Sequence, residues 1–192
     1  MEEATSYQEG VVKIRPAVQI DAETLWRLAY EDVAPEWKKW DAPYYEHVPL
    51  TYEQFIEREQ ESWIDNDARW VIEVDGNVVG MVSYYWEHQP SWWLEMGIVI
   101  FDPAYWNGGY GTIAFTLWIR HLFTIMPLVR VGYTTWSGNE RMVQIGYKLG
   151  MTMEARLRKC RLYEGVYYDS IRMGLLREEW EAFIAAKTAT DT

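Results

Sequence analysis

WWLEMGIVIFDPAYWNGGYGT, from Trp92 to Thr112, decides the fold of this chain. The stretch predicts an apolar strand, a short loop, and three glycines in four positions that open an amphipathic helix. A glycine-lined turn at a helix N-terminus leaves backbone N–H groups unpaired at the positive end of the helix dipole. Because such groups hold phosphates, we expect a ligand that carries a pyrophosphate or a similar group.

The same glycines satisfy a second phosphate-binding pattern. Gly109 to Ala114 match G-x-G-x-x-A, the fingerprint of dinucleotide-binding folds. However, the seven residues Asp102 to Gly108 separate the strand from the first glycine of that motif, whereas a dinucleotide turn follows its strand closely. The next predicted strand, 128–135, has no Asp or Glu for a ribose hydroxyl. We therefore keep a dinucleotide enzyme only as an alternative.

The composition is that of an ordinary globular protein. Of the 192 residues, 49% are hydrophobic and 24% are charged, and the length fits one domain with a full core. No apolar run approaches the roughly 20 residues of a membrane helix. The segment MEEATSYQEG at the start is acidic and polar, unlike a secretory signal. Since the lone Cys160 forms no internal disulfide, we expect a cytoplasmic location, and the short apolar runs predict no membrane partner.

The net charge of −11 argues against a nucleic-acid partner and is compatible with a cationic substrate such as an amine. The three histidines, His47, His88 and His121, are too scattered for a zinc motif, so we expect no metal. Tryptophan is unusually abundant, with 12 residues. This excess, together with exposed sheet edges, is compatible with a homodimer.

Periodicity predicts a single mixed α/β domain over residues 11–187, with flexible tails at 1–10 and 188–192. The predicted strands are 11–16, 69–74, 78–86, 92–101, 128–135, 154–163 and 166–175. The predicted helices are 21–31, 51–64, 109–123, 139–149 and 175–186. Predicted local signals are an Asp21 N-cap, a Thr51–Gln54 capping box, a hairpin turn at Asp75-Gly76-Asn77, a helix stop at Gly150 and a hairpin about Gly165.

Gly109 and Gly111, with a strand before them and a helix after them, resemble motif A of the GNAT superfamily of N-acetyltransferases, [Q/R]-x-x-G-x-[G/A]. The resemblance extends from Val11 to about Trp180 in element order and spacing. It implies a mixed, mostly antiparallel central sheet of about seven strands with helices on both faces. It also implies a pair of strands that splay apart to bind the cofactor.

Two further segments carry the resemblance. Asn139 opens the helix after the fifth strand, and Leu149-Gly150-Met151 matches the family's L-G-F ending of that helix. The run from Arg158 to Trp180 resembles the branch that acetylates the N-terminal alanine or serine of ribosomal proteins.

The resemblance implies acetyl-CoA as cofactor. Its pantetheine arm would contact the backbone of Ile98, Val99 and Ile100, and also Asn139, which equally suits a helix N-cap. Its pyrophosphate would accept backbone N–H groups from Gly108, Gly109, Tyr110, Gly111 and Thr112. Trp106 stands where the family usually has Gln or Arg, so backbone groups would contribute more of the binding.

Glu95 is the candidate general base. It lies fourteen residues before Gly109, the offset of the catalytic glutamate in histone-type members of the superfamily. Its apolar neighbours in the strand would desolvate the carboxylate and raise its pKa. The alternative is a solvated residue on the outward face of an alternating strand.

The general acid is harder to assign. Many members place a Tyr seven residues after the helix-opening Asn, where this chain has Gly146, and the N-terminal acetylating branch has Ser where this chain has Met142. Tyr147, beside Gly146, is the candidate that remains, with water and Tyr105 left open. Because both usual acids are missing, a non-catalytic acyl-CoA-binding or interaction module on the same fold stays an alternative to an enzyme.

The acceptor is expected on the loop that precedes the second helix. Trp37, Trp40, Tyr44 and Tyr45 combine there with nearby acidic residues, including Asp41. Such a surface suits a cation through charge and cation–π contact. The leading function is therefore acetyl transfer to a primary amine, either a peptide or protein N-terminus or a small cationic amine.

Overall fold

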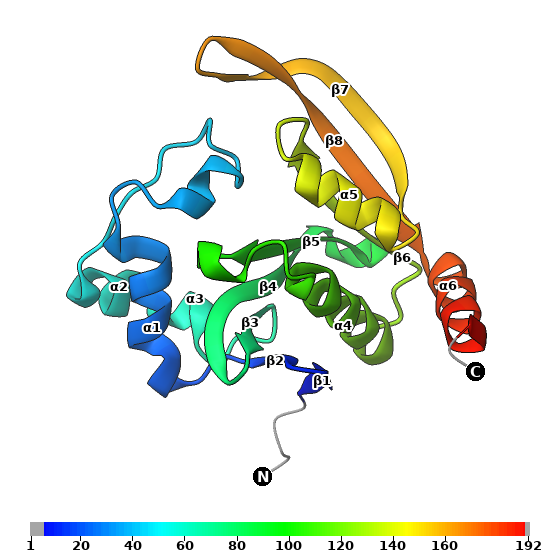
Figure 1. Cartoon of the computed structure of the whole chain (residues 1–192), viewed down its shortest axis with the longest axis horizontal. Helices are drawn as coiled ribbons and strands as arrows, with labels where there is room; N and C mark the ends of the chain where they lie inside the picture. The colour runs from blue at the N-terminus through cyan, green and yellow to red at the C-terminus, as the bar shows by residue number, and fades with distance from the viewer. Residues whose placement is uncertain (1–5, 191–192) are drawn as a thin grey trace. The chain divides into compact units, whose positions relative to one another are not determined.

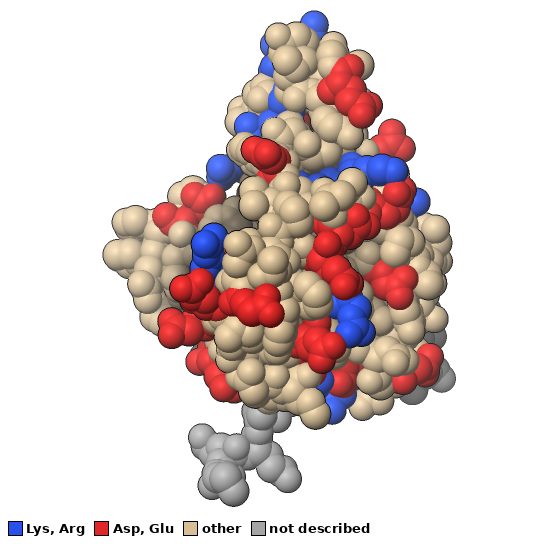
Figure 2. Space-filling view, turned by 90° about the vertical axis from the view of Figure 1, so that its left-hand side faces the viewer, with Lys and Arg blue, Asp and Glu red and all other residues tan. Residues whose placement is uncertain are grey.

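The computed structural model describes residues 6–190 (Figure 1). It divides into two compact units. Unit 1 comprises Met1–Tyr84 and Gly97–Trp118, and unit 2 comprises Tyr85–Met96 and Ile119–Thr192. The boundaries between the units fall inside two strands and one helix, Asn77–His88, Trp93–Ile100 and Tyr110–Ile125, so no linker separates the units in sequence. Acidic side chains are spread over the face drawn in Figure 2, in keeping with the net charge of −11.

Unit 1 holds the first half of the chain's elements. They are β1 (Tyr7–Glu9), β2 (Val12–Pro16), α1 (Ala22–Trp26), α2 (Tyr52–Arg58), α3 (Gln60–Trp63), β3 (Arg69–Val74) and the first part of β4 (Asn77–His88). Two further elements, β5 (Trp93–Ile100) and α4 (Tyr110–Ile125), belong partly to unit 1 and partly to unit 2. Thr51 caps α2, and its capping box with Gln54 is present as predicted. The β3–β4 hairpin also forms at the predicted turn, with Asp75 and Gly76 at positive φ.

One hydrophobic cluster joins the helices of unit 1 to its strands. Leu25 of α1 and Phe55 of α2 are fully buried in it, beside Val71 of β3 and Phe101. Figure 1 shows α1, α2 and α3 grouped together. Buried apolar side chains of α1 and α2 therefore attach these short helices to the strands.

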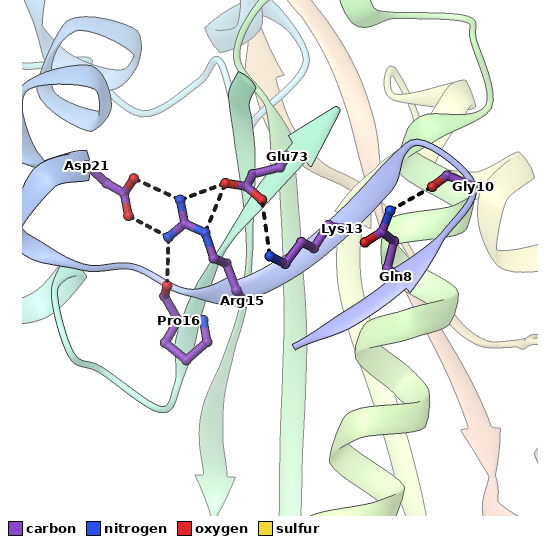
Figure 3. A network of polar contacts seen from close by, with 7 residues as sticks. All are labelled: Gln8, Gly10, Lys13, Arg15, Pro16, Asp21 and Glu73. Carbon is purple, nitrogen blue, oxygen red and sulfur yellow. Dashed lines mark hydrogen bonds and ion pairs between the residues drawn. The ribbon is translucent and has the colours of Figure 1, made fainter. Parts of the chain in front are cut away.

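Asp21 behaves differently from the N-cap that the sequence predicts. Its side chain makes no capping hydrogen bond to α1. Instead both carboxylate oxygens accept from the Arg15 guanidinium, at 2.6 and 2.9 Å, and Oδ2 also accepts from the Val18 N–H at 2.8 Å. Arg15 simultaneously donates to Glu73 of β3 at 2.7 Å (Figure 3). The prediction of a side-chain cap on α1 was wrong because the partly buried Arg15 guanidinium and the Val18 N–H occupy the carboxylate instead.

The start of the chain contains a strand where the sequence predicts a tail over residues 1–10. Tyr7–Glu9 pairs antiparallel with β2 in the register Tyr7↔Ile14. The turn between them uses Gly10 at φ +57°. An isolated pair of strands is only marginally stable, so β1 depends on the pairing of β2 with β3. The pattern of the first ten residues cannot show that distant pairing.

Unit 2 contains β6 (Arg130–Trp136), α5 (Glu140–Lys148), β7 (Thr152–Tyr163), β8 (Val166–Leu176) and α6 (Arg177–Thr190). The β7–β8 hairpin turns at Glu164-Gly165, as predicted, and Figure 1 shows it as a long two-stranded ribbon with α5 alongside. α6 continues to residue 190, where the sequence predicts a tail from 188. The Arg177 side chain donates to three backbone carbonyls at the end of α4 and just beyond it, those of Phe123, Met126 and Leu128.

The strand order is β1-β2-β3-β4-β5-β6-β8-β7, so the described residues form eight strands where the sequence predicts about seven. Of the seven neighbouring pairs in this order, β1–β2, β2–β3, β3–β4, β6–β8 and β8–β7 run antiparallel, and β5–β6 runs parallel. The β5–β6 register has a single partner pair, Glu95↔Gly132. The predicted fold class, a mixed and mostly antiparallel sheet with helices, is confirmed. Within the part of the chain that the structure describes, no helix is long and apolar enough to span a membrane.

Candidate active site

The glycine loop of unit 1 presents backbone donors at the start of α4. The first helical hydrogen bond runs from the Ile113 N–H to the Gly109 carbonyl at 3.2 Å. The N–H groups of Tyr110, Gly111 and Thr112 come before it and have no acceptor within the helix. Asn107 and Gly109 both have positive φ, +62° and +81°, a backbone conformation found in anion-binding turns. The loop therefore fits a pyrophosphate.

The adjacent glycine is required by packing. A Cβ on Gly108 would lie 2.6 Å from the Tyr110 ring, closer than real Cβ contacts. The Tyr110 ring in turn lies against Tyr105, with ring centroids 6.2 Å apart. The loop is thus held by aromatic contacts on one side, while nothing lies within 4 Å of a Cβ built on Gly109.

Trp106 connects this loop to β5. Its indole N–H donates to the Ile100 carbonyl at 2.8 Å. Its ring also meets Trp40 edge-on, with centroids 6.5 Å apart. Trp106, which replaces the family's Gln or Arg, therefore already donates to the Ile100 carbonyl. The predicted pantetheine contact at Ile100 would use the Ile100 N–H or the second lone pair of its carbonyl. Ile98, Val99 and Ile100 are all partly buried.

A cavity of about 210 Å³ lies within unit 1. Its aromatic walls are Tyr30, Trp37, Trp63 and Phe101. Its charged residues are Asp41, Glu59 and Arg69. Val99 of β5 also lines it, so the strand predicted to bind pantetheine forms part of the cavity wall.

The charged groups of the cavity differ in exposure, since Asp41 is exposed whereas Glu59 and Arg69 are partly buried. Desolvation raises the pKa of Asp41, against the opposing effect of Lys38. Burial also raises the pKa of Tyr30, with a further contribution from the Glu59 carboxylate. The pKa of Arg69 is lowered, again chiefly by burial. Electrostatic interactions with a ligand would therefore be stronger here than at an open surface.

The four residues predicted to bind the amine acceptor do not form one site in the structure. Trp37 lines the cavity, where its ring meets Phe101 at 5.3 Å and its indole N–H donates to the Leu28 carbonyl. Trp40 packs against Trp106 instead. Tyr44 and Tyr45 contact each other, with centroids 5.0 Å apart, and neither belongs to the cavity lining.

Sequence reasoning missed most of the cavity. Tyr30, Glu59 and Trp63 lie on predicted helices, where aromatic and acidic residues look like ordinary core and surface positions. Arg69 opens a strand. No local pattern links these positions, since helices and a strand far apart in the chain bring them together.

Glu95 lies in unit 2, where its side chain is completely buried. Its Oε1 accepts from Arg130 Nη1 at 3.3 Å, and its Oε2 accepts from the Thr134 hydroxyl at 3.2 Å. Burial raises the pKa of Glu95, although Arg130, Thr134 and Arg172 each oppose the rise. The solvated, outward-facing alternative does not describe this residue.

Two glycines make room for the cation beside Glu95. Arg130 also pairs with Glu154 of β7. Gly132 and Gly174 face each other across β6 and β8, and a Cβ on either would overlap Arg130 or Glu154 respectively. The Glu95–Arg130–Glu154 chain of charges therefore depends on both glycines.

The other predicted residues of unit 2 lie on α5. Asn139 is the N-cap, and its Oδ1 accepts from the Met142 N–H at 3.1 Å. Tyr147 is 49% exposed. The missing tyrosine at Gly146 has a structural cause, because a Cβ there would lie within 2.4 Å of the Tyr133 hydroxyl. Burial raises the pKa of Tyr133, and its hydroxyl donates to the Met142 carbonyl.

Among the described residues, no group of three or more His, Cys, Asp or Glu side chains could hold a metal ion. Cys160 is a free, exposed thiol.

The glycine loop, the β5 strand and the order of elements agree with one family. Residues 12–152 match the model of the acetyltransferase (GNAT) domain. The chain belongs to the GNAT acetyltransferase family. GNAT enzymes use acetyl-CoA, and this fold leaves no place for the dinucleotide alternative, whose sheet is mostly parallel.

Relatives of this GNAT acetyltransferase include enzymes that act on polyamines. It is 28% identical over 174 residues to spermidine N(1)-acetyltransferase of Escherichia coli K12, covering 89% of each chain. It is also 28% identical over 136 residues to an uncharacterized, SPbeta prophage-derived N-acetyltransferase of Bacillus subtilis, YokL, covering 70% of this chain and 76% of that one. A solved spermidine N-acetyltransferase from Vibrio cholerae, in complex with CoA and spermine, shares the fold with a TM-score of 0.73 at 18% identity, covering 90% of this chain and 99% of that one.

Proposed function

We propose that this GNAT acetyltransferase moves an acetyl group from acetyl-CoA directly to the primary amine of a small cationic acceptor bound in the unit 1 cavity. The observation that carries the proposal is that Val99 of β5 lines the cavity. It belongs to the strand expected to bind pantetheine, and it also lines the cavity beside Trp37 and Asp41. A molecule in the cavity would therefore lie next to the strand that carries the acetyl donor.

The glycine loop suits acetyl-CoA through its backbone. Tyr110, Gly111 and Thr112 offer N–H groups at the N-terminus of α4, directly after the left-handed Gly109. Gly108 and Asn139 complete the predicted cofactor residues. The bound cofactor supplies an activated thioester acetyl group, and the chain's own residues supply orientation and proton transfer.

The cavity suits an amine for two reasons. Asp41 provides a negative charge in the cavity lining, and the walls provide aromatic rings that attract cations. The volume of about 210 Å³ lies below the 300–1,000 Å³ typical of drug-sized ligands, so the acceptor or its reactive end is small. The spermidine acetyltransferases among the relatives support an amine of this kind.

We assign proton removal from the amine to Glu95. A buried carboxyl with a raised pKa is better matched to this role at neutral pH than an ordinary glutamate. Its route to solvent is the hydroxyl of Thr134, an exposed residue. Tyr147, with its half-exposed side chain, is the proposed donor of a proton to the departing thiolate.

A second candidate acceptor is a peptide or protein N-terminus. The run Arg158–Trp180, which resembles the branch that acetylates ribosomal proteins, favours it. This run forms most of the β7–β8 hairpin and the start of α6.

Thiol release from acetyl-CoA tests the proposal. The acceptor panel would contain spermidine, an aminoglycoside, short peptides with N-terminal alanine or serine, and small monoamines. We expect turnover with at least one small amine. Asp41→Asn should raise the KM for that amine at least tenfold, whereas the exposed control Asp65→Asn should leave it unchanged. Binding of acetyl-CoA without thiol release on any amine would support the non-catalytic module instead, and turnover on peptides alone would support the second candidate.

A further inference from the structure

One wall of the unit 1 cavity has hydrogen-bond donors without matching acceptors. Trp63 is 4% exposed, and its indole N–H has no hydrogen-bond partner among the described residues. Its N–H lowers the pKa of the Tyr30 hydroxyl, against the larger effect of burial. An unpaired buried donor is costly, so a ligand atom that accepts from it would be bound favourably.

Arg69 stands over the same indole. Its guanidinium carbon is 4.7 Å from the centre of the Trp63 ring. Nη1 makes a long hydrogen bond of 3.3 Å to the Ser62 hydroxyl. No carboxylate in the described part of the chain lies within ion-pair distance of this guanidinium. Four of its five N–H donors thus remain for a ligand or solvent.

Glu59 is the nearby acid that must be considered. Its charge raises the pKa of Arg69, but burial outweighs this effect. The Ser62 hydroxyl donates to the Glu59 backbone carbonyl at 2.8 Å and lies 3.4 Å from the Glu59 carboxylate. Ser62 therefore contacts both residues, and its hydroxyl is the one side-chain acceptor of the Arg69 guanidinium among the described residues.

We propose that the amine acceptor also carries a carboxylate, which Arg69 and Trp63 bind while Asp41 holds the cationic amine. This rests on the proposed function and specifies its substrate class as a small zwitterion of amino-acid type. Arg binds a carboxylate through two parallel hydrogen bonds, a geometry that a lysine cannot supply. A polyamine would instead place a second cation close to Arg69, where reduced solvation strengthens the repulsion.

Matched acceptors separate these possibilities. L-phenylalanine, L-phenylalaninamide and 2-phenylethylamine share one side chain and differ in the carboxylate, and alanine, alaninamide and ethylamine repeat the series with a small one. Thiol release would give kcat/KM for each and for spermidine. Quenching of tryptophan fluorescence would give their affinities independently of turnover. We expect the carboxylate member of at least one series to exceed its amine by tenfold or more in both measurements.

Variants assign the effect to Arg69. Arg69→Gln should remove at least nine-tenths of the preference for the carboxylate member over its matched plain amine. Arg69→Lys should restore part of the preference, because it restores the charge without the planar fork. Arg58→Gln, which removes an exposed cation from the same unit, is the control and should leave this preference unchanged. Thermal melting would establish that each variant is folded.

The outcomes are distinct. Equal values across a matched series, a preference for spermidine over every carboxylated amine, or a preference that survives in Arg69→Gln would each overturn the inference and leave the proposed acetyl transfer intact. Preference for the amide over both other members would reassign Arg69 to a neutral carbonyl, as in a peptide, and would also overturn it. Failure of every amine to release thiol would count against the proposed function itself.

Discussion

The Glu95 carboxylate and the Thr134 hydroxyl form a hydrogen bond of 3.2 Å between a completely buried group and an exposed residue. Arg130 holds the other carboxylate oxygen at 3.3 Å and is itself paired with Glu154. One side of the carboxyl is thus fixed by a cation, and the other leads toward solvent. This asymmetry makes specific predictions about catalysis and stability.

Glu95→Gln should lower kcat by roughly 10²-fold or more, because general bases contribute about 10² to 10⁴ to the rate. It should leave the affinity for acetyl-CoA nearly unchanged, because the predicted cofactor contacts lie elsewhere. Steady-state kinetics from pH 5 to 10, with calorimetric titration of acetyl-CoA, would measure both. Wild-type turnover across that range in the variant would remove the catalytic role.

Thr134→Val should raise the pKa of Glu95 further, since the hydroxyl hydrogen bond lowers it in the wild type. The acidic limb of the kcat profile should therefore move to higher pH. Losing one hydrogen bond to a charged group should also cost about 1.5–3 kcal/mol of stability. The exposed residue Thr152 of β7 offers a matched control in Thr152→Val, which should alter neither the profile nor the melting temperature. An unshifted pH profile in Thr134→Val would show that the Thr134 hydroxyl does not influence the pKa of the catalytic base.

The stability of the protein should depend on pH through Glu95 with a definite sign. Its pKa in the folded protein is raised above the ordinary value of 4.5, so the folded state holds a proton that the unfolded state releases. The contribution of Glu95 is therefore most favourable in acid and declines as pH rises from about 4.5 through the folded pKa. Urea denaturation of wild type and Glu95→Gln at several pH values would measure this. The free energy of unfolding of the wild type, relative to the variant, should fall as the pH increases, and a rise would contradict the burial argument.

Gly109→Ala should weaken acetyl-CoA binding beyond its effect on folding. An alanine at φ +81° is strained by about 1–2 kcal/mol, and relief of that strain would turn the loop N–H groups away from the pyrophosphate. Gly76→Ala is a close control, because Gly76 has φ +78° and, like Gly109, has open space where a Cβ would lie. Both variants should lose similar stability in denaturation, but only Gly109→Ala should lose affinity for acetyl-CoA in titration calorimetry. Equal affinities in the two variants would mean that the loop does not hold the cofactor.

Local chemistry explains what could be predicted from the sequence. The Thr51–Gln54 capping box and the turns at Asp75-Gly76 and Gly165 depend on residues within a few positions of one another, so their side chains specify them directly. The glycine loop before α4 is equally local, and it identified the family. Counting back from that loop selected Glu95 as the candidate base, a role that remains a prediction.

Tertiary structure alone decided the surroundings of those residues. Asp21 has the residue type of an N-cap, but the approach of Arg15 assigned its carboxylate to an ion pair. Glu95 could be counted, but its burial and its contacts with Arg130 and Thr134 required β6 beside β5. The cavity needed Trp37, Trp63 and Arg69 from separate elements. Turns and caps need only neighbours in sequence, whereas burial, charge pairing and a binding cavity exist only after distant segments have closed on one another.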